Sequence, residues 1–70
     1  MIYGILIDTG GRPDIVTGDG RLLGGLHCGD CFCYLGGEHW HSARLEYMDG
    51  WYIIQNGKMI VPPYGVCIRI

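Results

Sequence analysis

The chain has 70 residues, of which 49% are hydrophobic and 17% are charged, and its formal net charge at pH 7 is −2. This length allows one domain with one core, and the composition excludes intrinsic disorder, which requires low hydrophobicity and high charge. No apolar run approaches the ~20 residues of a membrane span, and no signal-peptide pattern is present. We therefore expect a cytoplasmic protein without a membrane partner.

The positive charges are too scattered for a nucleic-acid-binding surface. Such surfaces concentrate Lys and Arg on one face, because contacts with phosphates supply most of the affinity. Here no two basic residues are adjacent in the chain, and the five are Arg12, Arg21, Arg44, Lys58 and Arg69. Nucleic acid is therefore not an expected partner.

Glycine-containing turns separate short apolar runs along the whole chain. In chain order, the runs cover residues 5–7, 15–17, 31–35, 39–47, 51–54, 59–61 and 66–70. Asp49-Gly50 and Asn56-Gly57 lie between such runs, and these pairs are strong hairpin signals. The pattern predicts an all-β fold, either a small SH3-like barrel or a curled antiparallel meander of about five to seven short strands.

We expect residues 1–70 to form a single β domain in which the Gly-rich residues 8–26 are a mobile loop region. This region is either a wide turn without a function or a lid over a ligand. Residues 39–47, in contrast, alternate with a period of two, which predicts a strand. The alternation places His41, Ala43, Leu45 and Tyr47 on the inner side, and Trp40, Ser42, Arg44 and Glu46 on the outer side.

Several motifs carry a resemblance to a known family. They are His27-Cys28-Gly29-Asp30, then Arg44-Leu45-Glu46-Tyr47, then Gly50-Trp51-Tyr52. Over residues 22–70 the chain resembles a family of small bacterial domains of the SH3-like barrel type, which occur in bacteria, their phages and mobile elements. The resemblance implies a phage or mobile-element origin, but it implies no activity.

The four cysteines leave three possibilities open, which are free thiols, a zinc site and a disulfide. Cys28-x-x-Cys31 lacks the second Cys pair that a structural zinc site usually has. If a metal binds, its candidate ligands are Cys28, Cys31, Cys33 and His39. Because the sequence has no nucleophile elbow, phosphate-binding loop or dinucleotide fingerprint, we expect neither an enzyme nor a cofactor.

The remaining candidates for ligand binding are outward-facing aromatic and arginine residues. Trp40 or Tyr52 could stack on a nucleobase, while Arg44 and Arg69 could pair with phosphate. A chain this short has little room for an internal cavity, so we expect a homo-oligomer with the ligand between subunits.

The functional prediction is therefore a phage counter-defence module that sequesters a small anionic nucleotide signal. One alternative is an SH3-like interaction domain that binds and inhibits a host protein through the same face. Another alternative is a zinc-stabilised small domain.

Overall fold

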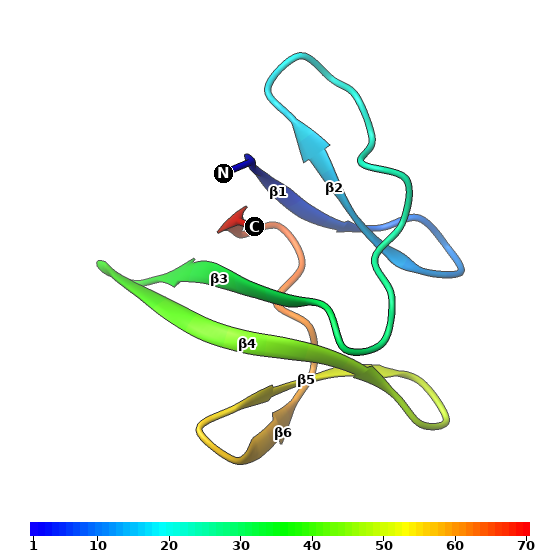
Figure 1. Cartoon of the computed structure of the whole chain (residues 1–70), viewed down its shortest axis with the longest axis vertical. Coiled ribbons are helices and arrows are strands. Elements are labelled where there is room, and N and C mark those ends of the chain that lie inside the picture. The colour runs from blue at the N-terminus through cyan, green and yellow to red at the C-terminus, as the bar shows by residue number, and fades with distance from the viewer.

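The computed structural model describes all 70 residues and contains seven strands and no helix (Figure 1). The strands are β1 (Tyr3–Asp8), β2 (Pro13–Thr17), β3 (Cys31–Gly36), β4 (His39–Tyr47), β5 (Trp51–Gln55), β6 (Lys58–Ile60) and β7 (Cys67–Arg69). They form one antiparallel sheet in the order β2-β1-β7-β3-β4-β5-β6. The expected all-β fold is confirmed. The fold contains no helix of the length and hydrophobicity that a membrane crossing requires.

The sheet consists of a hairpin and a four-strand meander joined by the last strand. The β1–β2 hairpin and the β3–β6 meander each pair neighbours in the chain, and β7 lies between β1 and β3. The chain ends are consequently side by side, because the amides of Ile2 and Ile70 each donate to the other residue's carbonyl, at 2.8 and 2.9 Å (Figure 1).

The sheet curls so that the β1–β2 turn comes into contact with the start of β5. The Nε1–H of Trp51, at the start of β5, donates to the carbonyl of Gly11 in the β1–β2 turn at 3.1 Å. The guanidinium of Arg12 lies 5.1 Å from the centre of the Trp51 ring. These contacts hold the sheet in a curled, barrel-like shape, and the core fills its inner side.

The core is one cluster of nine buried residues, namely Leu6, Ile15, Leu26, Phe32, Tyr34, Ala43, Leu45, Ile53 and Ile68. The predicted alternation is confirmed for Ala43 and Leu45, which are buried, while His41 is half-buried. Tyr47 continues the alternation and is paired with Trp51, which packs against the core, but 55% of Tyr47 is exposed. Tyr47 is the last residue of β4, and there the inner side opens into a groove.

The Gly-rich residues 8–26 are not one continuous loop. They include β2, which pairs with β1 over its whole length. Residues 21–26 then run back along β2, and Leu26 inserts into the core with 1% of its surface exposed. The expected mobility of this region, and its possible role as a lid over a ligand, remain predictions.

Candidate functional site

One surface groove brings together aromatic, cationic and thiol groups from four parts of the chain. It is open to solvent, has a volume of about 560 Å³, and is lined by Gly11, Arg12, His27, Cys28, Tyr47 and Trp51. We call this site the aromatic groove. Its walls are the β1–β2 turn, the segment before β3, the last residue of β4 and the first residue of β5.

The aromatic side of the groove is built by the β4–β5 hairpin. Tyr47 and Trp51 are paired across the two strands, and their rings meet in a T-shaped arrangement with centres 5.0 Å apart. Asp49 has a φ of 59°, which allows the chain to reverse within the three residues between the two rings. Because both rings lie at the strand ends, where the core stops, their surfaces remain accessible to a ligand.

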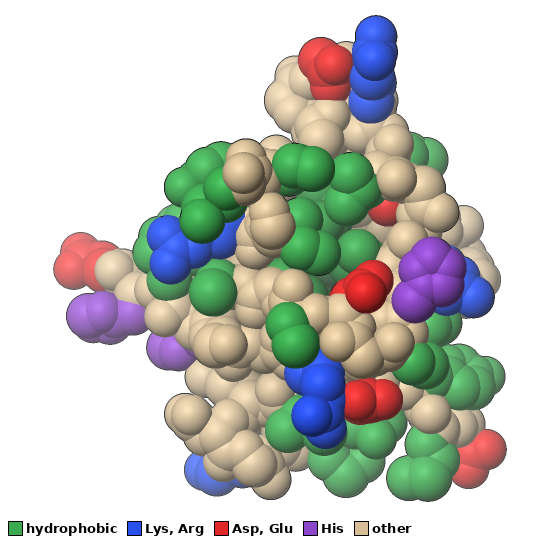
Figure 2. All heavy atoms as spheres, viewed as in Figure 1, with side chains coloured by type: hydrophobic (Ala, Val, Ile, Leu, Met, Phe, Trp, Pro, Cys, Tyr) green, Lys and Arg blue, Asp and Glu red, His purple; other side chains and the backbone are tan.

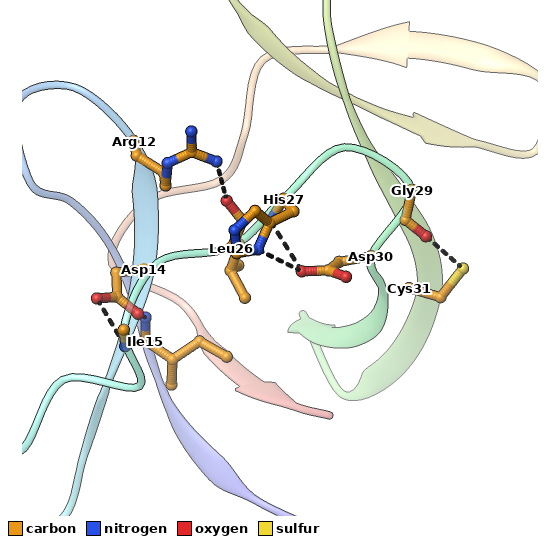
Figure 3. A network of polar contacts seen from close by, with 9 residues as sticks. Arg12, Asp14, Ile15, Leu26, His27, Gly29, Asp30 and Cys31 are labelled. Carbon is orange, nitrogen blue, oxygen red and sulfur yellow. Dashed lines mark hydrogen bonds and ion pairs between the residues drawn. The ribbon is translucent and has the colours of Figure 1, made fainter.

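Arg12 connects the aromatic side of the groove to the segment before β3, which is shown in Figure 3. Its Nη1 donates to the carbonyl of Leu26 at 2.7 Å, and its guanidinium stacks on Trp51. The bond to Leu26 holds the segment that carries His27 and Cys28 beside the groove. The other guanidinium N–H groups have no partner within the protein, so they can bind an acceptor on a ligand.

The segment from His27 to Asp30 is a turn held by its own carboxylate. The Asp30 side chain accepts a hydrogen bond from the His27 amide at 2.8 Å, and His27 Nδ1 lies 3.9 Å from the same oxygen (Figure 3). Both His27 and Cys28 are exposed. The turn therefore presents an imidazole and a thiol at the rim of the groove.

The four predicted ligand-binding residues lie elsewhere, on the outer face of the sheet, opposite the core. Cross-strand pairing places Arg69 beside Cys33 and Trp40 beside Leu35, and the Arg69 guanidinium lies 4.4 Å from the Trp40 ring centre. Tyr3 also contacts Trp40, with ring centres 6.1 Å apart. We call Tyr3, Trp40 and Arg69 the outer cluster.

Arg44 and Tyr52 do not belong to this cluster. The Nε of Arg44 lies 2.7 Å from a carboxylate oxygen of Glu46, and Tyr52 is paired with Glu46 across β4 and β5. Strand β3 separates Arg44 from the strand that carries Arg69, so the structure divides the predicted residues into two pairs.

The candidate metal ligands do not converge. Cys31 lies opposite Arg44 at one end of the β3–β4 pair, whereas His39 lies opposite Gly36 at the other end. Cys28 lines the groove, and Cys33 lies beside Arg69. The structure contains no group of three or more His, Cys, Asp or Glu residues that could hold a metal ion, and all four cysteines are free.

The groove was not predicted from the sequence, although aromatic and arginine residues were expected to bind the ligand. Tyr47 and Trp51 lie at least 20 residues along the chain from Arg12 and His27 (47 − 27 = 20), so only the curl of the sheet brings them together. The one local signal was the pair of aromatic residues that flank the Asp49-Gly50 turn. Such a pair occupies facing positions in a hairpin.

These features define a small all-β domain with an aromatic, arginine-containing groove where the β1–β2 turn meets the start of β5. The chain belongs to the family described as Domain of unknown function (DUF5348), whose model matches residues 5–70. It is similar to a protein from Ruminococcus gnavus of known crystal structure, with 34% sequence identity and a TM-score of 0.79. The match covers 97% of this chain and 99% of that chain. No curated protein matches the chain.

Proposed function

We propose that this domain is a non-catalytic binding module whose aromatic groove captures a small anionic ligand with a planar ring, of the nucleotide class. The observation that carries the proposal is that two aromatic rings, a guanidinium and an imidazole line one groove with a volume of about 560 Å³. Small-molecule sites usually have volumes of roughly 300–1,000 Å³ and combine apolar walls with a few polar groups.

The groove offers a separate contact for each part of such a ligand. The exposed ring of Tyr47 can stack on a nucleobase, since aromatic faces bind bases largely regardless of base identity. The free N–H groups of Arg12, supported by His27, can donate charge-assisted hydrogen bonds to phosphate. Arg12 is already held by Leu26, so little side-chain entropy is lost on binding.

The groove changes the expected position of the ligand but leaves its proposed role unchanged. From sequence, the ligand is expected between subunits, because a chain this short has little room for an internal cavity, whereas this surface groove is formed by one chain. The setting that we propose is sequestration of a nucleotide signal by a phage or mobile-element protein in counter-defence. Sequestration requires tight binding and no chemical step.

A nucleotide titration followed by NMR tests this proposal. We expect cyclic or ADP-ribose-type nucleotides to shift the amide signals of the groove. We expect Tyr47→Ala to weaken binding about 5- to 150-fold, because stacking contributes ~1–3 kcal/mol per base. Tyr3→Ala is the matched control, since Tyr3 is 52% exposed and Tyr47 55%, and Tyr3 lies on the outer face. No response to any nucleotide, or equal losses in both variants, would refute the proposal.

A second candidate function is protein docking through the outer cluster. The stacking of Arg69 on Trp40 beside an exposed Tyr3 supports it, because Trp, Tyr and Arg are the residues enriched at interface hot spots. This function predicts a protein partner whose binding is lost in Trp40→Ala and retained in Tyr47→Ala. The two substitutions therefore distinguish the two functions.

A further inference from the structure

The two edge strands of the sheet differ in how their outward backbone groups are satisfied. Residues 21–26 cover β2, because the amide of Thr17 donates to Arg21 at 2.8 Å and the amide of Leu23 donates to Ile15 at 3.0 Å. No such segment covers β6, and residues 58–61 make no backbone hydrogen bond outside the strand ladder. The sheet therefore has one closed edge and one open edge.

The geometry of the β5–β6 hairpin identifies the free groups on the open edge. Asn56 and Gly57 have φ values of 51° and 74°, as a two-residue type I′ turn requires. Gln55 and Lys58, which flank this turn, form a hydrogen-bonded pair, so the next pair, Ile54 and Met59, is not hydrogen-bonded. The N–H and C=O of Met59 consequently point away from β5, into solvent.

The side chains along this edge are also unusually apolar for an exposed strand. Met59 is 62% exposed, Ile60 36%, and the following Val61 79%. Natural edge strands are usually protected by charges, proline or a bulge, because bare edges pair with other strands. Here Lys58 and Pro62 flank the apolar segment but do not interrupt it.

We propose that β6 pairs antiparallel with β6 of a second copy of this chain, about a two-fold axis at Met59. Each Met59 N–H then donates to the Met59 carbonyl of the other copy, and the contact is self-complementary, as two-fold symmetry requires. Lys58 faces Ile60 of the other copy rather than its lysine, so like charges are not opposed. This register satisfies the free backbone groups and buries part of the exposed apolar surface.

The proposal does not depend on the ligand of the aromatic groove. Because β6 has only three residues, the interface is small, and we expect dissociation constants in the micromolar range. The dimer therefore forms and dissociates reversibly with protein concentration.

Sedimentation velocity across a micromolar concentration series tests the proposal with two variants at one position. Met59→Pro removes the outward N–H, which the β5–β6 ladder does not use, so the hairpin is retained. Met59→Leu is the matched control, because it keeps both the donor and an apolar side chain. We expect the native chain and Met59→Leu to dimerise and Met59→Pro to stay monomeric.

Amide exchange in the native chain gives a second measurement that needs no variant. We expect the Met59 amide to become protected as the concentration rises through the dimerisation range, while amides far from β6 are unchanged. A native monomer at every concentration, a Met59→Pro dimer as stable as the native one, or a dimer with an unprotected Met59 amide would each overturn the proposal. Protection of Met59 only by an added extended peptide would also overturn it in favour of a peptide partner.

Discussion

Asp14 shows how one buried carboxylate organises the Gly-rich region. Only 4% of it is exposed, and its side chain accepts hydrogen bonds from the amides of Ile15 at 2.7 Å and Gly24 at 3.3 Å (Figure 3). Gly24 and Gly25 have φ values of 112° and 96°, which favour glycine and let successive amides converge on the carboxylate. Burial raises the pKa of Asp14, but backbone hydrogen bonds outweigh burial and lower the pKa below its usual 3.8.

We expect Asp14→Asn to destabilise the fold by about 1–3 kcal/mol at neutral pH, since it removes charge-assisted hydrogen bonds from a buried site. The folded-state pKa is lowered, so the stabilisation is complete above the unfolded-state pKa and is lost as the pH falls through the folded-state value. Urea unfolding of both proteins from neutral to acid pH measures this difference. A difference that stayed constant into strong acid would exclude the carboxylate charge as its source.

A second polar network, formed by Tyr34, Gln55 and His41, satisfies the half-buried histidine of β4. The Tyr34 hydroxyl donates to the side-chain oxygen of Gln55, whose amide nitrogen lies 3.1 Å from His41 Nδ1. His41 Nε2 lies 3.2 Å from the Gly36 carbonyl, so Nε2 carries the proton and Nδ1 accepts from Gln55. Both ring nitrogens of this half-buried histidine therefore have partners within the fold.

At the scale of elements, turn chemistry made most strands predictable. Asn56-Gly57 and Asp49-Gly50 set hairpins through local backbone preferences, which a sequence displays directly. The position of β7 between β1 and β3 was not predictable, because it depends on pairing between residues more than 30 apart in the chain. The exposure of Tyr47 was not predicted either, since it depends on where the core ends.

Gly4 permits the close packing of β1 on β2. A Cβ at this position would lie 2.4 Å from Ile15 Cγ2 and 2.5 Å from the Val16 carbonyl oxygen. We expect Gly4→Ala to destabilise the fold by about 1–3 kcal/mol, because the backbone contact cannot be relieved by a side-chain rotation. Thermal unfolding measures the loss.

Gly18→Ala is the control for Gly4→Ala. It lies just after β2, and a Cβ there would meet no atom within 4 Å. We expect its melting temperature to stay close to that of the native chain. Equal losses in the two variants would show that a steric clash at Gly4 is not the cause of the effect, because Gly→Ala by itself restricts the unfolded chain and favours folding.

At the scale of the whole molecule, the fold is a curled sheet whose surface is largely uncovered. Only 12 of 70 residues are buried, and Figure 2 shows hydrophobic side chains exposed over several elements, with acidic and basic side chains interspersed among them. The interspersed charges agree with the scattered basic residues of the sequence. The aromatic groove could not be predicted from the sequence, because it exists only where the curl of the sheet brings the β1–β2 turn to the start of β5.

The small core makes each of its members important, and Leu26 most of all, since it comes from outside the strands. It is 1% exposed, and its carbonyl holds Arg12 while its amide donates to Pro13 at 2.8 Å. A domain of this size is stabilised by roughly 0.05–0.15 kcal/mol per residue, whereas Leu→Ala in a core costs about 2–5 kcal/mol. We therefore expect Leu26→Ala to remove most of the stability and to lose cooperative thermal unfolding.

Leu23→Ala is the control, because Leu23 lies in the same segment but is 39% exposed. We expect its thermal unfolding to be close to that of the native chain. If the two variants unfolded alike, burial of the Leu26 side chain would not be a major contribution to the stability of the core.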